Sequence, residues 1–250
     1  MTALGFALAG VIGLSLGLLG GGGSILAVPV LVYVLGFTMK QAVPMSLAVV
    51  GTTSLFGAVS HHRDRNIRWD AAMAFGPAAI VGAFAGGKLG LAVSSRLQLV
   101  IFAVLMLAAA GSMYFGPALW GGGNPAPTRA RRPLPMIAVL GLLVGAITGF
   151  VGIGGGFLYV PALVLLGGLV MKQAVGTSLV LIVLSCTAGL TSYLGRVEIP
   201  WRDTLLFTSL AVVGVLIGSR LVRRVSQTNL RRAFAVMLVI MGVLVLLKPR

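Results

Sequence analysis

Acidic residues are scarce in this 250-residue chain, in which four Asp or Glu stand against 19 Lys or Arg. Charged residues make up only 9% of the sequence and hydrophobic residues 58%, whereas soluble domains carry about 25% charged residues. A soluble globular domain is therefore excluded. The four acids, Asp64, Asp70, Glu198 and Asp203, stand outside the longest apolar stretches. Membrane proteins that move protons commonly bury a carboxylate among their spans, so we expect no Asp or Glu relay.

Cysteine and histidine are almost absent as well. The single Cys186 excludes an intramolecular disulfide and a thiolate metal site. The adjacent His61 and His62 point in different directions on a helix and have one acid nearby, so we expect an interfacial loop rather than a metal site. No Ser/His/Asp or Cys/His combination falls within the apolar stretches, so an enzyme is poorly supported and no cofactor is expected.

Long apolar stretches are what the chain has in abundance, with a mean hydropathy of +1.07. Residues 71–87, 97–115 and 233–247 approach the roughly 17 to 25 residues that a membrane-spanning helix needs. None of them alternates apolar and polar residues as a transmembrane β-strand does. The sequence therefore predicts an all-α polytopic membrane protein with the lipid bilayer as a partner.

The formal charge of +15 is spread over short connections rather than gathered in one domain. This distribution favours orientation in the membrane and contact with anionic lipids over binding of nucleic acid, for which we expect no role. The run 3–19 has no basic residues before it. We therefore expect a first span there rather than a cleaved signal peptide.

An internal duplication organises the chain. The segment 39–43 recurs letter for letter as 171–175, and about 60 surrounding residues align at the same offset of 132. A duplicated apolar unit predicts two homologous repeats that share a site between them. We expect a first repeat over 1–115, a linker rich in Pro, Gly and Arg over 116–135, and a second repeat over 136–250. The glycines that coincide at this offset are Gly20, Gly22 and Gly23 with Gly152, Gly154 and Gly155.

A short apolar piece of about 14 residues in each repeat, 24–37 and 157–170, decides the topology. A glycine cluster precedes each piece, as in a re-entrant or broken helix. If the pieces do not cross, the chain has eight spans and parallel repeats; if they do, it has ten and inverted repeats. Lys and Arg divide 10 against 9 between the two sides in the first case and 12 against 7 in the second. The positive-inside rule therefore favours inverted repeats with both termini outside.

The two glycine clusters are the candidate substrate site, because broken backbone inside a membrane must line a cavity or be buried in protein. Ser24 is expected to cap the half-helix that it begins, where free amides favour an anion. The alternative is that these glycines serve only close helix packing. The candidate binding residues are Gly21, Gly22, Gly23, Ser24, Gln41 and Ser46 in the first repeat, and Gly154, Gly155, Gly156, Phe157, Gln173 and Ser178 in the second.

Two further glycine pairs have a structural explanation. Gly82 and Gly86 precede Lys88 and resemble part of a phosphate-binding loop, but Leu89 stands where that loop needs Ser or Thr. The second repeat carries a similar pair at 214 and 218, so both pairs predict small-xxx-small helix contacts. The sequence leaves open whether these contacts lie within one chain or between copies in a homo-oligomer.

The duplicated Gly-rich break ahead of a Val-Pro segment resembles the TauE/SafE family, also called sulfite exporters. The resemblance rests on residues 17–29 and 149–161 and extends over essentially the whole chain. It implies a multi-pass carrier in the bacterial inner membrane that moves sulfite, a sulfonate or a related small sulfur-containing anion. We expect alternating access with the site between the two repeats. A passive anion channel and a non-transporting membrane assembly subunit remain as alternatives.

Overall fold

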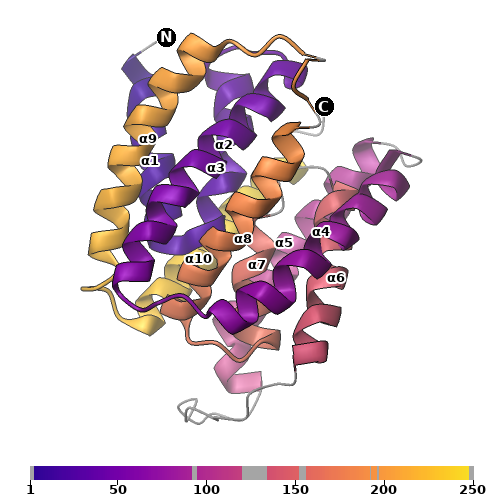
Figure 1. The fold of residues 1–250 in the computed structure, drawn as a ribbon, viewed down its shortest axis with the longest axis vertical. Coiled ribbons are helices and arrows are strands. Elements are labelled where there is room, and N and C mark those ends of the chain that lie inside the picture. The colour runs from indigo at the N-terminus through magenta and orange to yellow at the C-terminus, as the bar shows by residue number, and fades with distance from the viewer. Residues whose placement is uncertain are drawn as a thin grey trace.

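The computed structural model describes residues 3–91, 95–119, 134–151, 156–191, 193–195 and 197–247. Every regular element in this part of the chain is helical (Figure 1). The longer helices are α1 (Ala3–Leu19), α3 (Met39–Arg63), α4 (Trp69–Leu91), α5 (Ser95–Leu119), α6 (Leu134–Val151), α8 (Met171–Thr191), α9 (Trp201–Leu221) and α10 (Gln227–Leu247). The prediction of an all-α polytopic membrane protein is confirmed.

Two short composite segments stand between these helices. The first consists of the 3₁₀ turn η1 (Gly20–Gly23), helix α2 (Ser24–Pro29) and the π-helical turn η2 (Val30–Val34); the second consists of α7 (Gly156–Pro161) and the π-helical turn η3 (Ala162–Leu166). Each π turn follows a proline directly. Its widened hydrogen bonds run from the Leu35 amide to the Val30 carbonyl, at 3.1 Å, and from the Gly167 amide to the Ala162 carbonyl, at 2.8 Å. These are the irregularities expected after a missing N–H.

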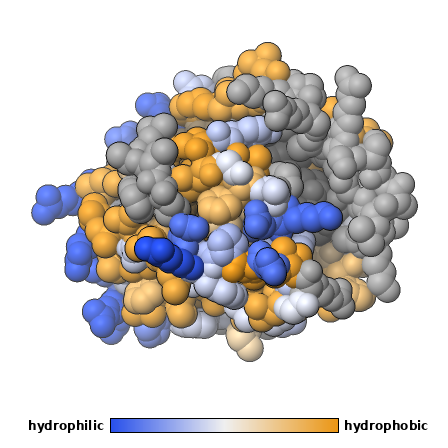
Figure 2. All heavy atoms as spheres, turned by 90° about the horizontal axis from the view of Figure 1, so that it is seen from above, coloured by the Kyte–Doolittle hydropathy of each residue, from blue (hydrophilic) through white to orange (hydrophobic). Residues whose placement is uncertain are grey.

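Within the part of the chain that the structure describes, five helices are long and apolar enough to cross a membrane, namely most of α3, α4, α8, α9 and α10. Shorter apolar helical stretches lie in α1, α5 and α6 and in the two composite segments. Figure 2 looks onto the end of the molecule that carries both termini and shows hydrophilic residues there, with hydrophobic residues between and around them. Along the helices, large apolar side chains such as Met73, Phe84 and Leu205 are exposed, as lipid contact requires.

The helices of the two halves pack reciprocally. In the order of the chain, α1 of the first half packs against α9 of the second, and α6 of the second half packs against α4 of the first. The helices α3 and α8 form a central pair, and α5 packs against α10. Each half therefore buries its first helix in the other half, so neither half forms a complete hydrophobic core alone.

Glycines set the close packing of the pairs α4/α6 and α1/α9. A Cβ at Gly82 would overlap the Leu142 carbonyl, and one at Gly86 would overlap the Ala146 carbonyl. In the other pair, Gly214 lies against Gly10 in the same way. The predicted small-xxx-small contacts are confirmed and, in the described residues, they lie within one chain.

Successive glycine contacts also give the helix directions. The contacts between α4 and α6 advance together along both helices, so these helices run parallel. In the central pair, Gly51 lies against Cys186 while Gly57 lies against Leu179, so α3 and α8 run in opposite directions. The same holds for α5 and α10, because Gly242 lies against Leu107 while the Arg231 side chain reaches the Ser112 carbonyl. Equivalent helices thus run oppositely, which is the geometry expected of inverted repeats.

The short segment α2–η2 runs back along α1. A Cβ at Gly23 would lie 2.6 Å from the Leu16 amide nitrogen, and further on Leu35 contacts Gly5 near the start of α1. The chain therefore returns to the end of the molecule at which α1 begins before α3 starts. Each half consequently has five segments, and both termini lie at the same end, as Figure 1 shows.

One sequence expectation needs correction, and another stays a prediction. Helix α5 continues to Leu119 and α6 begins at Leu134. Residues 120–133 of the expected linker 116–135 lie outside the described residues, so the division of the chain into two repeats and a linker stays a prediction. The His61 and His62 pair belongs to the last turn of α3 rather than to a loop, and His61 is fully buried. The loop was expected because adjacent side chains on a helix point in different directions and one acid stands nearby, which argued only against a metal site; in the structure, packing against α1 covers one of the two rings.

Candidate functional site

The first break in the chain follows α1 at Gly20. Gly20 has a φ of +66°, a backbone conformation that L side chains rarely adopt, and it turns the chain into the 3₁₀ turn that contains Gly21, Gly22 and Gly23. The turn bonds part of the backbone internally, so it offers fewer free amides than a fully unwound break. The Ser24 amide, for example, donates to the Gly21 carbonyl.

The predicted capping role of Ser24 is wrong. The N-cap position of α2 is Gly23, with no side-chain cap. The Ser24 hydroxyl donates instead to the Gly21 carbonyl at 2.6 Å. Because the residues before Ser24 remain helical, its side chain points back along the turn, where a carbonyl and not an amide is within reach.

The break of the first half touches the corresponding part of the second half. A Cβ at Gly21 would overlap the Gly156 carbonyl and lie 2.9 Å from the Phe157 amide nitrogen, and one at Gly156 would lie 3.0 Å from the Ser24 hydroxyl oxygen. Gly154 and Gly155 lie outside the described residues. The structure therefore brings Gly21, Ser24 and Gly156 together, with backbone against backbone.

One hydroxyl group of the central helices lies beside this contact. It belongs to Ser178 of α8, because a Cβ at Gly20 would be 2.5 Å from its oxygen. Ser46 of α3 does not join it, since its neighbour Leu47 lies against Gly189, toward the opposite end of α8. Ser178 donates to the Val175 carbonyl at 2.8 Å, and Ser46 donates to Val43 at 2.7 Å. A hydroxyl has one proton to donate. In this conformation each of these groups would have to rotate away from its carbonyl to bind an anion.

The two predicted glutamines do not lie together. Gln41 is in the first turn of α3 and Gln173 in the first turn of α8, so the antiparallel pairing of these helices places them at opposite ends of the molecule. The side-chain oxygen of Gln41 accepts from the Thr38 hydroxyl at 3.0 Å as part of a capping box. Gln41 also lines an open surface pocket with residues 197–201. The structure thus places the two glutamines at opposite ends of the molecule, which we call its two mouths, rather than at the break.

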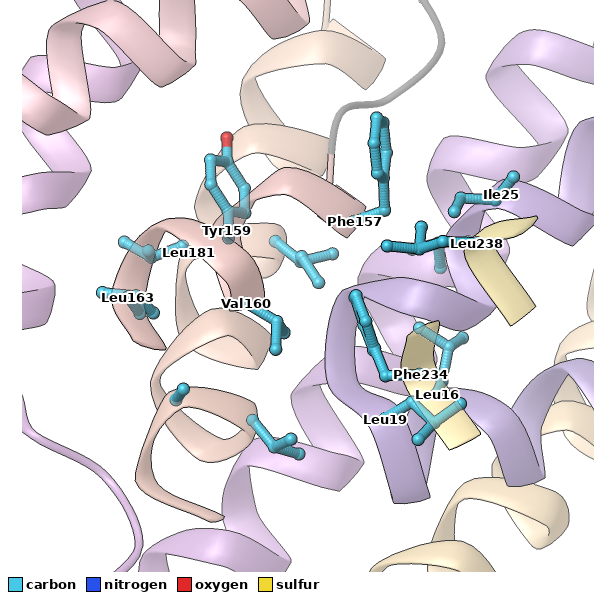
Figure 3. Packing of buried hydrophobic residues seen from close by; sticks show 14 of the residues in the cluster. Leu16, Leu19, Ile25, Phe157, Tyr159, Val160, Leu163, Leu181, Phe234 and Leu238 are labelled. Atoms are coloured by element: carbon cyan, nitrogen blue, oxygen red, sulfur yellow. The ribbon is translucent and has the colours of Figure 1, made fainter. Parts of the chain in front are cut away.

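Phe157 is packed in the apolar core and is 2% exposed. Figure 3 shows its ring on the side of α7 that faces Ile25 of α2 and Leu238 of α10. The neighbouring Tyr159 fixes α7 on another side, because its hydroxyl lies 2.7 Å from the Ser185 hydroxyl and its ring meets Phe75 edge to face. The break is therefore held by rigid aromatic contacts, and Phe157 is covered in this conformation.

Charges lie at the ends of the helices, away from the break. The acids are Asp64, at the end of α3, Asp70 and Asp203, in first helical turns, and Glu198, ahead of α9. Arg68 forms an ion pair with Asp70 at 2.6 Å, and this hydrogen-bonded contact raises the pKa of Arg68. In the described part of the chain, no three His, Cys, Asp or Glu residues gather as metal ligands do.

Sequence reasoning missed two features that the structure places near the break. Gly20 was noticed in the cluster but not counted as a site residue, although its positive φ makes the turn. His61 reaches the end of α1, with its Nε2 3.4 Å from the Gly17 carbonyl oxygen. The glycine cluster was the signal for the turn at Gly20, whereas the His61 contact has no signal in the sequence, since it depends on which helix lies beside α3.

These features define a class of protein: a multi-pass helical membrane protein whose two halves meet at interrupted helices, as in secondary transporters. The comparisons agree. A model of the family described as sulfite exporter TauE/SafE matches residues 5–245, and the chain belongs to this family. It is a membrane transporter protein of the TauE/SafE kind.

Curated relatives extend over the same length. A "Probable membrane transporter protein" of Xylella fastidiosa (strain 9a5c) is 32% identical over 243 residues, which are 95% of this chain and 92% of that protein. Proteins with the same description from Haemophilus influenzae and Methanocaldococcus jannaschii are each 27% identical and are covered over 93% and 94% of their lengths. No solved structure gives a significant match. The relatives are named as transporters, without a substrate.

Proposed function

We propose that this protein transports a small sulfur-containing anion, such as sulfite or an organosulfonate, by alternating access. One observation carries the proposal: the break of the first half and the start of α7 of the second half touch at Gly21 and Gly156. Because each half supplies one side of this contact, the contact changes whenever one half rocks against the other. A substrate held there is exposed to each side in turn.

The charge distribution supports an anionic substrate. The nearest described neighbours of Gly21 and Gly156 include no acidic residue, whereas basic residues gather at the helix ends. Lys40 and Lys172 flank the two glutamines at opposite mouths, and positive mouths raise the local concentration of an anion. The hydroxyls of Ser24 and Ser178 supply donors without a buried charge once they rotate from their carbonyls, and Ser46 supplies a further donor closer to the opposite end of α8. Gly22, Gly154 and Gly155 complete the proposed site.

The choice of a sulfur-containing anion rests on the family description, which names sulfite export. A location in a bacterial inner membrane is part of the proposal, and the orientation with both termini outside rests on the basic residues. Arg63 ends α3, and Arg65 and Arg68 stand in the connection to α4, where Arg223 of the second half pairs with Asp64. We assign this end to the cytoplasm.

Counterflow in proteoliposomes tests the proposal. Vesicles that contain the purified protein are loaded with sulfite, thiosulfate, sulfoacetate, taurine or an aryl sulfonate, and the uptake of labelled anion is compared with that of protein-free vesicles. We expect saturable exchange for at least one sulfur-containing anion. Flux that exceeds carrier turnover and shows no counterflow would indicate a channel instead. Protein that is folded but exchanges none of these anions would refute the proposal.

A further inference from the structure

His61 is the one fully buried histidine in the described chain, and it joins the ends of three helices. It lies in the last turn of α3. Its ring reaches the Gly17 carbonyl of α1, and its Cβ would be 3.2 Å from a Cβ at Gly176 of α8. Glycine at position 176 leaves space first for the Asn66 carbonyl, whose oxygen would lie 2.5 Å from an added Cβ, and then for the Cβ of His61.

The two ring nitrogens have different surroundings. A carbonyl oxygen only accepts hydrogen bonds, so the 3.4 Å contact with Gly17 requires Nε2 to carry the hydrogen. The neutral ring then has its lone pair on Nδ1, which is buried and finds no hydrogen-bond partner among the described residues. A second proton on Nδ1 would create a buried donor without an acceptor, which is costly.

The charged groups around this ring are balanced rather than acidic. Asp64, the nearest carboxylate, already pairs with Arg223 at 2.6 Å. Helix α1 contributes no charged residue, and Lys172 of α8 lies with its ammonium 3.4 Å from the Arg223 carbonyl. In the described part of the chain, no unpaired carboxylate is therefore available to stabilise a protonated His61 ring while the ring is packed against α1. The other titratable or charged groups at this end are His62, Arg63 and Arg65 beside the ring, Arg68 and Asp70 at the start of α4, and Arg220 and Arg224 near the end of α9.

The surroundings of His61 form a polar closure between the two halves, which we call the His61 closure. It consists of the pair Asp64 and Arg223, the hydrogen bond of 2.9 Å between Ser219 and Ser60, and the hydrogen bond of 3.0 Å from the Arg68 amide to the Thr177 hydroxyl. The equivalent positions at the opposite end cannot repeat it. At the offset of 132, the residue equivalent to Arg68 is Pro200, which has no amide hydrogen. The residue equivalent to Thr177 is Met45, and the residue equivalent to His61 is Tyr193.

We propose that His61 is a proton-binding site that couples protonation to the opening of this end of the transporter. When the end of α3 separates from the end of α1, water reaches Nδ1 and supplies the proton. When the closure reforms, Nδ1 returns the proton to water, since the closed arrangement offers it no acceptor. Gly17 lies three residues before Gly20, so this movement acts directly on the break. The proposal extends alternating access, but it can be tested without knowledge of the transported anion.

Thiol labelling measures the opening. Val222, which is 1% exposed at the end of α9 and takes no part in the closure, is replaced by Cys in a chain that also carries Cys186→Ser, and a membrane-impermeant maleimide is applied to proteoliposomes between pH 8 and pH 5. A matched chain with His62→Cys places the thiol on the exposed neighbour of His61 and corrects for the pH dependence of the reagent. The measured quantity is the ratio of the two labelling rates.

We expect the ratio to rise as the pH falls, by at most tenfold per pH unit because a single proton is bound. His61→Gln keeps a donor for the Gly17 carbonyl and has no titrating nitrogen, so we expect a ratio that does not change with pH; His61→Asn serves if His61→Gln is poorly folded. A ratio independent of pH with His61 present would overturn the proposal, and so would a slope that survives in the variant. Neither result bears on anion counterflow, so the two proposals fail separately.

Discussion

Replacement of Gly21 by Ala is the sharpest perturbation of the proposed site. The added Cβ would overlap the carbonyl of Gly156 and lie 2.9 Å from the Phe157 amide nitrogen. Both are backbone groups of α7, so neither can rotate away as a side chain would. Since ordinary contacts of a Cβ begin at 3.4 Å, the first break and α7 have to separate by about 1 Å or more.

The cost to stability and the cost to transport differ in size. Overpacking costs about 1 to 3 kcal/mol, and Ala recovers about 0.5 to 1 kcal/mol over Gly in a helical segment. A net loss of about 1 to 2 kcal/mol leaves the protein folded in the membrane. A displacement of about 1 Å in a positioned site, in contrast, lowers a rate on the order of 100-fold. We therefore expect folded protein with about 1% of the exchange rate.

Counterflow of the anion that the unmodified protein exchanges is the assay, with folded yield measured by size-exclusion chromatography. Gly10→Ala is the matched control, because a Cβ at Gly10 meets no atom within 4 Å and we expect its exchange rate to be unchanged. The reasoning is refuted if Gly21→Ala exchanges within twofold of Gly10→Ala at equal folded yield. In that case the contact between the halves would have no part in transport.

Three other outcomes follow from the packing and charges. Gly82→Val should sharply reduce the yield of folded protein, because its Cβ overlaps the Leu142 carbonyl, whereas Gly111→Val meets open space and should purify normally. Asp64→Asn should lower the free energy of unfolding by less than about 1 kcal/mol, since Arg223 is largely exposed; a larger loss in a denaturant titration would contradict this. Cys186, which is 2% exposed, should react with a polar maleimide only after denaturation, and rapid labelling of folded protein would show that α8 is accessible.

The sequence predicted the helices well because each apolar run is long and is bounded by glycine, proline or charge. Residues 3–19 were expected as the first span and form α1 with the same bounds. The glycine clusters and the short apolar pieces after them predicted a broken helix in each repeat, and the structure has a short helix there that ends at Pro29 or Pro161, with a π turn directly after it. These predictions succeed because they depend on local chemistry, namely the missing N–H of proline and the transfer of apolar side chains into lipid.

The site was harder to predict for a physical reason. Ser24 follows four glycines and was expected to cap a helix, but the glycines form a 3₁₀ turn and leave it a carbonyl to bond. The repeated glutamines suggested a shared site, but the opposite directions of α3 and α8 separate them. A repeat shows that two residues are equivalent. It does not show that they are neighbours.

By itself, the sequence determined that this chain is a helical membrane protein built from a duplicated unit with two Gly-rich breaks, because composition and spacing fix the transfer into lipid and the interruption of helices. The tertiary structure decided that α1 pairs with α9 and α4 with α6, that the halves run oppositely, and that Gly21 meets Gly156. In lipid, apolar side chains give no hydrophobic preference for one partner. The partner of each helix is instead set by the close approach of backbones at glycines, and this approach can be seen only in the tertiary structure.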